Sequence, residues 1–203
     1  MKKQHIFSLA LAAFLVLAGA VIAGSGRTDE TAIVPAPIGS AVEDFSLPGT
    51  DGSTHSLNSL KGQNGSALIF ISVQCPISNG YNERMEALSQ EYGKRGISVI
   101  GINSNATEDA NAVKAHAAEK HFTFAVLKDQ GNKIADKLGA MRTPEVYLLD
   151  ANNKLVYHGR IDNSKDESQV NAKDLREAMD ALLAGKPIAK PTAMAFGCSI
   201  KRA

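Results

Sequence analysis

The sequence lacks the features that mark several classes of protein. Its 203 residues include two cysteines, no tryptophan and only 5% aromatic residues. Two cysteines are too few for a scaffold built from disulfides, so an ordinary hydrophobic core must hold the fold together. The scarcity of aromatic residues argues against a surface that stacks bases or sugars. Lysine and arginine number 22 against 21 aspartates and glutamates, and this balance excludes a strongly basic nucleic-acid binder.

The first 23 residues have the layout of a secretory signal peptide. Lys2 and Lys3 precede an uncharged stretch over residues 6–23, and small residues gather at 18–20 and 23–24. A basic start, an apolar middle and a small-residue exit are typical of a cleaved signal. We therefore expect a secreted or periplasmic protein, with residues 24–38 as a flexible leader. The alternative is an uncleaved membrane anchor, because 18 uncharged residues approach the length of about 20 that spans a bilayer.

In residues 39–185, segments with the apolar pattern of buried strands alternate with segments that have the apolar spacing of helices. Continuous apolar runs at 66–73, 97–102, 124–127 and 145–150 are typical of buried strands, and 154–159 completes a hairpin. Apolar residues at helical spacing predict helices over 77–92, around 134–138 and over 175–182. A further helix is expected to begin at Thr107, as its cap, and to end at residue 119. This alternation predicts an α/β domain with a mostly parallel sheet, flanking helices and a C-terminal antiparallel hairpin. Residues 186–203 form a tail that carries the second cysteine.

The chemistry concentrates at Cys75, which directly follows an apolar run and directly precedes a predicted helix. Pro76 fits the first helical position, where its missing N–H costs nothing. The free amides and the dipole of a helix start stabilise a thiolate, which is the nucleophilic form of cysteine. We therefore identify Cys75 as the candidate reactive group, with an inert buried cysteine as the alternative. Ser78 occupies the place of the second thiol of a Cys-x-x-Cys pair, so the local dithiol is absent. Two reactions of Cys75 stay possible: reduction of a peroxide through a sulfenic acid, or a mixed disulfide with a partner.

The order of these motifs resembles the thioredoxin fold. More closely, it is similar to the redoxin group, the alkyl hydroperoxide reductase and thiol-specific antioxidant proteins, and to a peroxiredoxin-like subgroup within it. The similarity covers residues 39–201 and is carried by the stretches 42–47, 70–76, 101–105, 143–150, 155–162 and 197–201. The resemblance implies an oxidoreductase with antioxidant activity.

The resemblance also implies roles for residues around Cys75. Ser72 occupies the hydroxyl position three residues before the family's cysteine, and we expect its hydroxyl to contact the thiolate or an oxidant oxygen. Leu68 stands where the family has proline, which is a departure from the pattern. Arg142 lies in the region where peroxiredoxins place an arginine near the thiolate, although its offset from Asp150 is two residues longer than expected.

The Thr143–Pro144 pair resembles the site of the cis-proline in thioredoxin folds. X–Pro bonds are the ones that tolerate the cis form, so a cis Thr143–Pro144 bond is expected, with an ordinary trans proline at the start of a strand as the alternative. In the family this proline faces the active cysteine. We therefore expect Pro76, Thr143 and Pro144 to shape the substrate groove.

Cys198, 123 residues after Cys75, is the only other thiol. Three interpretations stay open: a resolving cysteine on a mobile tail, acting within one chain or across a homodimer; a partner in a structural disulfide; or a free thiol without a role. Closing so long a loop could stabilise the fold by about 4–5 kcal/mol.

These observations predict an exported thiol oxidoreductase that reduces hydrogen peroxide or an alkyl hydroperoxide through Cys75. Cys198 or an external thiol, thioredoxin-like or small, would restore the reduced state. The histidines do not cluster with Cys75 at metal-ligand spacing, and we expect no cofactor. The alternatives are a thiol–disulfide oxidoreductase acting on exported proteins, or a redox-inactive module that binds a partner beside Pro144.

Overall fold

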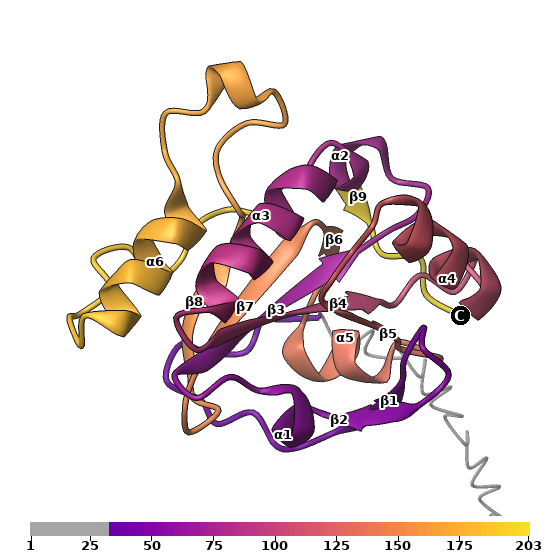
Figure 1. Cartoon of the computed structure of the whole chain (residues 1–203), viewed down its shortest axis with the longest axis horizontal. Helices are drawn as coiled ribbons and strands as arrows, with labels where there is room; N and C mark the ends of the chain where they lie inside the picture. Colours follow the sequence, from indigo (N-terminus) through magenta and orange to yellow (C-terminus); the bar gives the residue numbers. More distant parts are fainter. Residues whose placement is uncertain (1–32) are drawn as a thin grey trace, which may run out of the picture. The chain divides into compact units, whose positions relative to one another are not determined.

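The computed structural model describes residues 33–203, so the expected signal peptide and most of the leader lie outside the described residues. A five-stranded sheet with the order β5-β4-β3-β7-β8 forms the centre (Figure 1). Its strands are β3 (Gly65–Ile71), β4 (Ile97–Asn103), β5 (Ala125–Lys128), β7 (Glu145–Asp150) and β8 (Leu155–Gly159). β3 runs parallel to β4, and β4 to β5, whereas β7 is antiparallel to β3 and forms the expected hairpin with β8. The sheet is therefore mixed.

Helices cover both faces of this sheet, which explains why β3 is apolar at almost every position. Ala67, Ile69 and Ile71 pack on one face against α3 (Asn82–Gly93), α4 (Ala110–Glu119) and α6 (Asp174–Leu183). Leu68 and Phe70 point to the opposite face. There they meet α1 (Leu57–Leu60), α5 (Lys133–Leu138) and the hairpin of β1 (Ser46–Pro48) and β2 (Thr54–Ser56). Alternate residues of one strand thus serve two cores.

The sequence predicts one helix over 77–92, and this prediction is wrong. The chain instead forms α2 (Pro76–Asn79), a break at Gly80 and Tyr81, and then α3. The Asn79 side-chain amide donates to the Val73 carbonyl oxygen at 2.8 Å, and the Tyr81 hydroxyl donates to Asp162 at 2.9 Å. These hydrogen bonds join both side chains to loops outside the helix. The spacing of apolar residues does not predict such contacts.

The cap of α4 also differs from the prediction. Asp109, rather than Thr107, precedes the first turn, and its carboxylate accepts a hydrogen bond from the Ala112 amide at 2.8 Å. Aspartate is as good a cap as threonine. The shift leaves Thr107 and Glu108 in the loop between β4 and α4, where Glu108 points inward and is 2% exposed.

The tail is part of the domain rather than a mobile appendage. After α6, the Ala193 amide donates to the His158 carbonyl oxygen on β8. Further on, β9 (Cys198–Ser199) pairs antiparallel with β6 (Arg142–Thr143). Ile200 is buried in the core, and the Lys201 amide donates to the Asn105 side-chain oxygen at 2.8 Å. In Figure 1 the yellow strand β9 lies beside α2 and β6.

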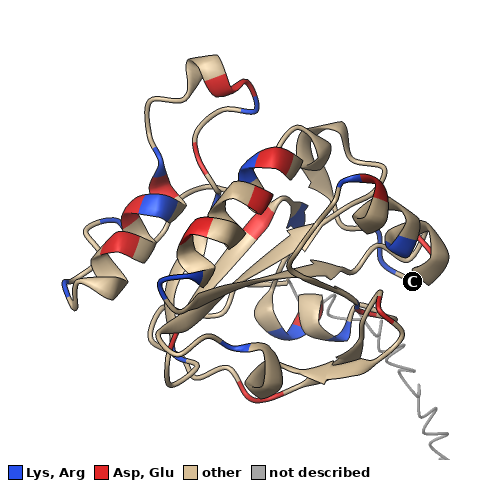
Figure 2. Ribbon diagram, in the orientation of Figure 1, with Lys and Arg blue, Asp and Glu red and all other residues tan. Residues whose placement is uncertain are grey.

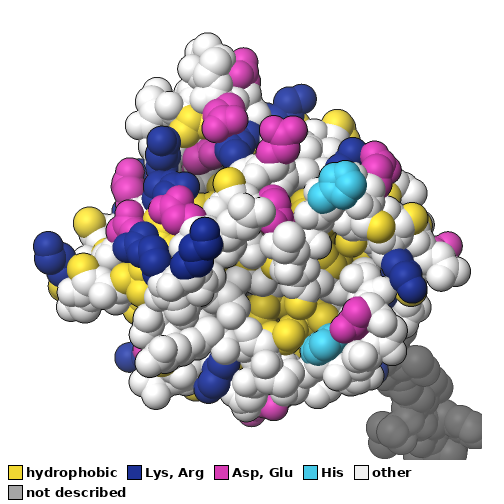
Figure 3. All heavy atoms as spheres, viewed as in Figure 1, with side chains coloured by type: hydrophobic (Ala, Val, Ile, Leu, Met, Phe, Trp, Pro, Cys, Tyr) yellow, Lys and Arg dark blue, Asp and Glu magenta, His cyan; other side chains and the backbone are white. Residues whose placement is uncertain are grey.

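The surface of the domain mixes charges of both signs. Red and blue segments lie close together on the ribbon, and on α3 and α6 the acidic residues outnumber the arginines (Figure 2). On the face shown in Figure 3, charged side chains gather over α3 and α6. Within residues 33–203, none of the helices has the length and apolar character that crossing a bilayer requires.

Candidate active site

Cys75 lies between β3 and α2 and directly precedes the helix as the sequence predicts, but residues 72–74 form a loop between the end of β3 at Ile71 and Cys75. The residue caps α2, Pro76 takes the first helical position, and the Ser78 amide donates to the Cys75 sulfur at 3.3 Å. Because α2 has only four residues, its dipole is small. The sulfur is therefore stabilised by an individual amide bond rather than by the long helix that the sequence predicts.

Cys198 lies beside Cys75. In the β6–β9 pair Cys198 stands opposite Thr143, and the Thr143 carbonyl oxygen is 3.3 Å from the Cys75 sulfur. The side chain of each cysteine shifts the pKa of the other, so the two thiols are near neighbours, and both cysteines are free. The structure thus brings together two cysteines that are 123 positions apart in the sequence.

The two thiols have opposite tendencies to ionise. Burial raises the pKa of Cys75, which is 3% exposed, but hydrogen bonds from Cys198 and the Ser78 amide lower it more. Its net pKa is below the ordinary value of 9.0. The pKa of Cys198 is raised, chiefly because its proton is held by Cys75 and secondly by burial. Cys75 is therefore the more acidic thiol of the pair and Cys198 the less acidic one.

The segment that joins β6 to β7 lies beside the cysteine loop and contains the expected cis peptide bond between Thr143 and Pro144. Glu145 organises this segment: one carboxylate oxygen accepts the Met141 and Arg142 amides at 2.8 Å, and the other binds the His158 ring nitrogen at 2.7 Å. The buried Thr143 hydroxyl has no hydrogen-bond partner among the described residues, and the Thr143 side chain contributes to lowering the pKa of Cys75. Thr143 thus lies next to the sulfur through its carbonyl oxygen, beside the proline that the family resemblance places there.

Arg142 does not contact the sulfur. Its guanidinium group is exposed and donates to the Gly197 carbonyl oxygen at 3.1 Å. The expected role as thiolate stabiliser is therefore corrected to a contact with the tail, because β6 directs the side chain away from Cys75. Gly197 has φ = +149°, and a Cβ atom there would overlap the Thr143 carbonyl oxygen. Only glycine lets β9 approach this loop so closely.

Ser72 is also placed differently from the expectation. Its hydroxyl donates to Glu108 at 2.6 Å and accepts from the amides of Cys75 at 3.0 Å and Gln74 at 3.2 Å. Among the described residues no hydrogen bond joins this hydroxyl to the Cys75 sulfur. Ser72 therefore holds the backbone of the cysteine loop. Sequence reasoning missed Glu108, although an acidic residue after β4 lies at the carboxyl end of the strand next to β3.

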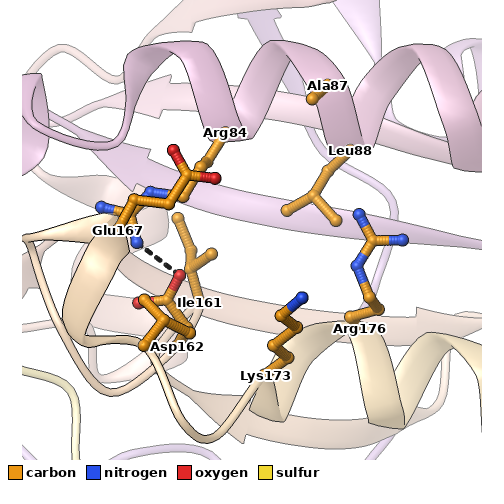
Figure 4. A pocket seen from close by; sticks show the side chains of 9 residues that line it. Arg84, Ala87, Leu88, Ile161, Asp162, Glu167, Lys173 and Arg176 are labelled. Carbon is orange, nitrogen blue, oxygen red and sulfur yellow. Dashed lines mark hydrogen bonds and ion pairs between the residues drawn. The ribbon is translucent and has the colours of Figure 1, made fainter.

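The described residues also form a cavity of about 360 Å³ between α3 and the segment around 161–176. Figure 4 shows Arg84, Lys173 and Arg176 around it together with Asp162 and Glu167. Arg84 is paired with Asp162 at 2.5 Å, so part of the positive charge is already neutralised. The lining includes neither cysteine, and the cavity is separate from the thiol site.

Comparison with known proteins places the chain in a family. The AhpC/TSA family model matches residues 38–158. A chloroplastic peroxiredoxin Q from Triticum aestivum is 29% identical over 64% of this chain and 63% of its own length, so the chain spans less than two thirds of that relative. The thiol–disulfide oxidoreductase ResA from Halalkalibacterium halodurans is 26% identical over 58% of this chain and 65% of its own.

A solved structure covers more of the chain. The crystal structure of a hypothetical protein from Sinorhizobium meliloti 1021 is 30% identical, with a TM-score of 0.78, over 84% of this chain and 97% of its own. More distant solved structures confirm the thioredoxin-like fold. The chain therefore belongs to the AhpC/TSA family and has the thioredoxin-like, peroxiredoxin-like architecture of its redoxins.

Proposed function

We propose that the protein is an exported thiol oxidoreductase that reduces a peroxide through Cys75, with Cys198 as the resolving thiol. The observation that carries this proposal is that Thr143, which pairs with Cys198 in β9, also contacts the sulfur of Cys75, so that a cysteine with a lowered pKa lies beside one with a raised pKa. A thiolate is needed for the attack on an oxidant, and a thiol beside it is needed for resolution. The relatedness to peroxiredoxin Q supports a peroxide as the oxidant.

The proposed reaction has three steps. The Cys75 thiolate attacks one oxygen of the peroxide, the O–O bond breaks, and the leaving oxygen takes one proton from water, so that a sulfenic acid and an alcohol or water result. The Cys198 sulfur then attacks the Cys75 sulfur, and the hydroxyl group leaves as water when it takes the Cys198 proton. An external thiol donor, thioredoxin-like or small, supplies two electrons and two protons that reduce the Cys75–Cys198 disulfide.

The burial of Cys75 favours a small oxidant. Only 3% of the residue is exposed, and β9 lies over it through the pairing with β6. Hydrogen peroxide and short alkyl hydroperoxides need a smaller opening than a bulky substrate does. Both thiols belong to the same chain, so resolution needs no second subunit, and a homodimer stays a prediction.

Export rests on the sequence alone. The basic start, apolar middle and small-residue exit of residues 1–24 support a cleaved signal peptide. An oxidising compartment suits a pair of cysteines that cycles through a disulfide. Fractionation of the expressing cell, with sequencing of the N-terminus of the recovered protein, would distinguish a cleaved protein from a membrane-anchored one.

A second candidate is thiol–disulfide exchange with exported proteins. The antiparallel pairing of Cys198 with Thr143 favours it, because an extended segment with a cysteine already fits beside the reactive sulfur. The relatedness to ResA points in the same direction. In this reaction Cys75 would attack a substrate disulfide, and Cys198 would displace the reduced substrate.

One experiment separates these functions. The reduced protein is treated with one equivalent of hydrogen peroxide and analysed by mass spectrometry, in the wild type and in Cys198→Ser and Cys75→Ser variants. We expect a Cys75–Cys198 linkage in the wild type, a trapped Cys75 sulfenic acid in Cys198→Ser, and no reaction in Cys75→Ser. Two untouched thiols in the wild type, with reduction of insulin disulfides, would select the exchange reaction. Neither activity would leave a redox-inactive binding module.

A further inference from the structure

Glu108 is a buried carboxylate that no step of the proposed reaction uses. It is 2% exposed and lies in the loop between β4 and α4. Four groups donate to its two oxygens: the Ser72 hydroxyl at 2.6 Å, the amides of Val73 and Gln74 at 3.0 Å each, and the Asn103 side chain at 2.5 Å. Three of these donors belong to the loop that ends at Cys75.

Ser72 extends this arrangement to the reactive residue itself. The hydroxyl that donates to Glu108 accepts the Cys75 amide at 3.0 Å. The three consecutive amides of Val73, Gln74 and Cys75 are therefore all held by Glu108 directly or through Ser72. Cys75 is buried and Val73 half-buried, and backbone amides that are shielded from water need such acceptors. Without the carboxylate, the Ser72 hydroxyl and the amides of Val73 and Gln74 would lose the acceptor that they share.

A buried cation balances the carboxylate. Lys128, 5% exposed, donates to the Asn103 side-chain oxygen at 2.8 Å, while the other end of that amide donates to Glu108. Hydrogen bonds from Ser72 and the loop amides outweigh burial and lower the pKa of Glu108, so the group is ionised at neutral pH. An ionised acceptor binds amides more strongly than a neutral one. The charge is thus part of what holds the loop.

We propose that Glu108 is a positioning residue for Cys75, which holds residues 72–75 so that the sulfur meets the Ser78 amide and Cys198. The inference rests on Cys75 as the reactive thiol of the proposed function, but not on the nature of its oxidant. Glu108 does not touch the sulfur in this arrangement. It acts through the backbone, by way of Ser72.

A purely electrostatic role would have the opposite signature. A nearby negative charge disfavours a thiolate, so removing that charge would lower the pKa of Cys75. Loss of positioning would instead weaken the bond from the Ser78 amide and raise the pKa of Cys75. The sign of the change therefore separates the two roles.

The test uses the full chain with Cys198→Ser, in which Cys75 is the only cysteine. The thiolate is titrated through its ultraviolet absorbance, with no peroxide present, in Glu108→Gln, in Ser72→Ala and in the double variant. We expect each single change to raise the pKa of Cys75 and to lower the thiolate fraction at pH 7 by about tenfold, the effect of one pKa unit. Because both residues act through one chain of bonds, the double variant should add little to the larger single effect.

The matched control is Glu86→Gln, which loses hydrogen bonds to Thr123 and should leave the titration of Cys75 unchanged. A lowered or unchanged pKa in Glu108→Gln, or full additivity in the double variant, would overturn the proposal. If Glu108→Gln does not fold, Ser72→Ala decides alone, because it changes no charge: a wild-type titration in that variant also overturns it. Since no oxidant is involved, failure of the peroxidase activity leaves this result intact.

Discussion

Cys198 stands opposite Thr143 in the β6–β9 pair, and the carbonyl oxygen of Thr143 lies 3.3 Å from the sulfur of Cys75. One residue of β6 thus contacts both cysteine-bearing segments. The position of β9 on β6 therefore sets the separation of the two thiols, and this dependence can be tested at Gly197.

Gly197→Val should uncouple the two cysteines. A Cβ atom at this position would overlap the Thr143 carbonyl oxygen, and φ = +149° is unfavourable for any other residue. We expect β9 to move away from β6 and the peroxide-induced Cys75–Cys198 disulfide to form at least about tenfold more slowly, since intramolecular reactions depend steeply on placement. Quenched-flow oxidation followed by thiol counting measures this rate.

The control for this variant is Gly93→Ala. Gly93 has open space around its Cα atom and no positive φ, so an added methyl group meets nothing. Its rate of disulfide formation should equal that of the wild type. Equal rates in Gly197→Val and Gly93→Ala would show that the contact between β9 and β6 does not control the reaction.

Replacement of Cys198 should reveal its part in the ionisation of Cys75. The hydrogen bond from Cys198 is the largest influence that lowers the pKa of Cys75. Cys198→Ala removes the donor, so the pKa of Cys75 should rise, whereas Cys198→Ser keeps a hydroxyl donor and should raise it less. Titration of the thiolate absorbance in both variants checks this order. Identical titrations would exclude the hydrogen bond as the cause.

Reduction of the disulfide should begin at Cys198. Cys198 is more exposed than Cys75, and Cys75 is the better leaving thiolate because its pKa is the lower of the two. After brief treatment of the oxidised protein with limiting glutathione and an acid quench, we expect the mixed disulfide on Cys198. Peptide mapping that finds glutathione mainly on Cys75 would contradict the prediction.

Stability should decline in acid as Glu145 becomes protonated. Burial raises the pKa of Glu145, but its bonds with His158 and with two loop amides lower it more, so the net pKa is below the ordinary 4.5. The unfolded chain therefore binds this proton at a higher pH than the folded chain does. The stabilisation is complete above about pH 4.5 and is lost as the pH falls through the folded pKa.

Glu145→Gln should remove this dependence in part. At pH 7 the variant should be less stable by about 1–3 kcal/mol, the usual cost of breaking a buried hydrogen-bonded group. Urea unfolding at several pH values should also give a shallower acid decline than in the wild type. The exposed Glu119→Gln serves as the control and should change stability little. An unaltered acid decline in Glu145→Gln would assign the acid sensitivity to other carboxylates.

The sequence predicts Cys75 as the candidate reactive cysteine because local signals coincide there. An apolar run precedes Cys75 and Pro76 follows it, and in the structure Cys75 is the cap of α2 and Pro76 its first residue, while β3 ends at Ile71. The hairpin of β7 and β8 and the cis bond before Pro144 are likewise local features, and both are confirmed. Each depends on neighbouring residues rather than on distant contacts.

The partners of Cys75 could not be predicted in the same way. Glu108 and Ser72 meet because β3 and β4 are neighbours in the sheet. The spacing of residue types along the sequence does not predict that contact. The break at Gly80 depends on bonds made by Asn79 and Tyr81 to other loops. The tail shows no hydrophobic period, so its docking through Gly197 and Ile200 became evident only from the structure.

The docking of the tail also has a consequence for the order of assembly. Its partners are His158 on β8, Arg142 and Thr143 on β6, and Asn105 after β4, which come from widely separated parts of the chain. Contacts of such high sequence separation form late, because many loops must close before they exist. We therefore expect the two sulfurs to meet late in folding. Formation of the native thiol pair would then be a chemical marker of a nearly complete domain.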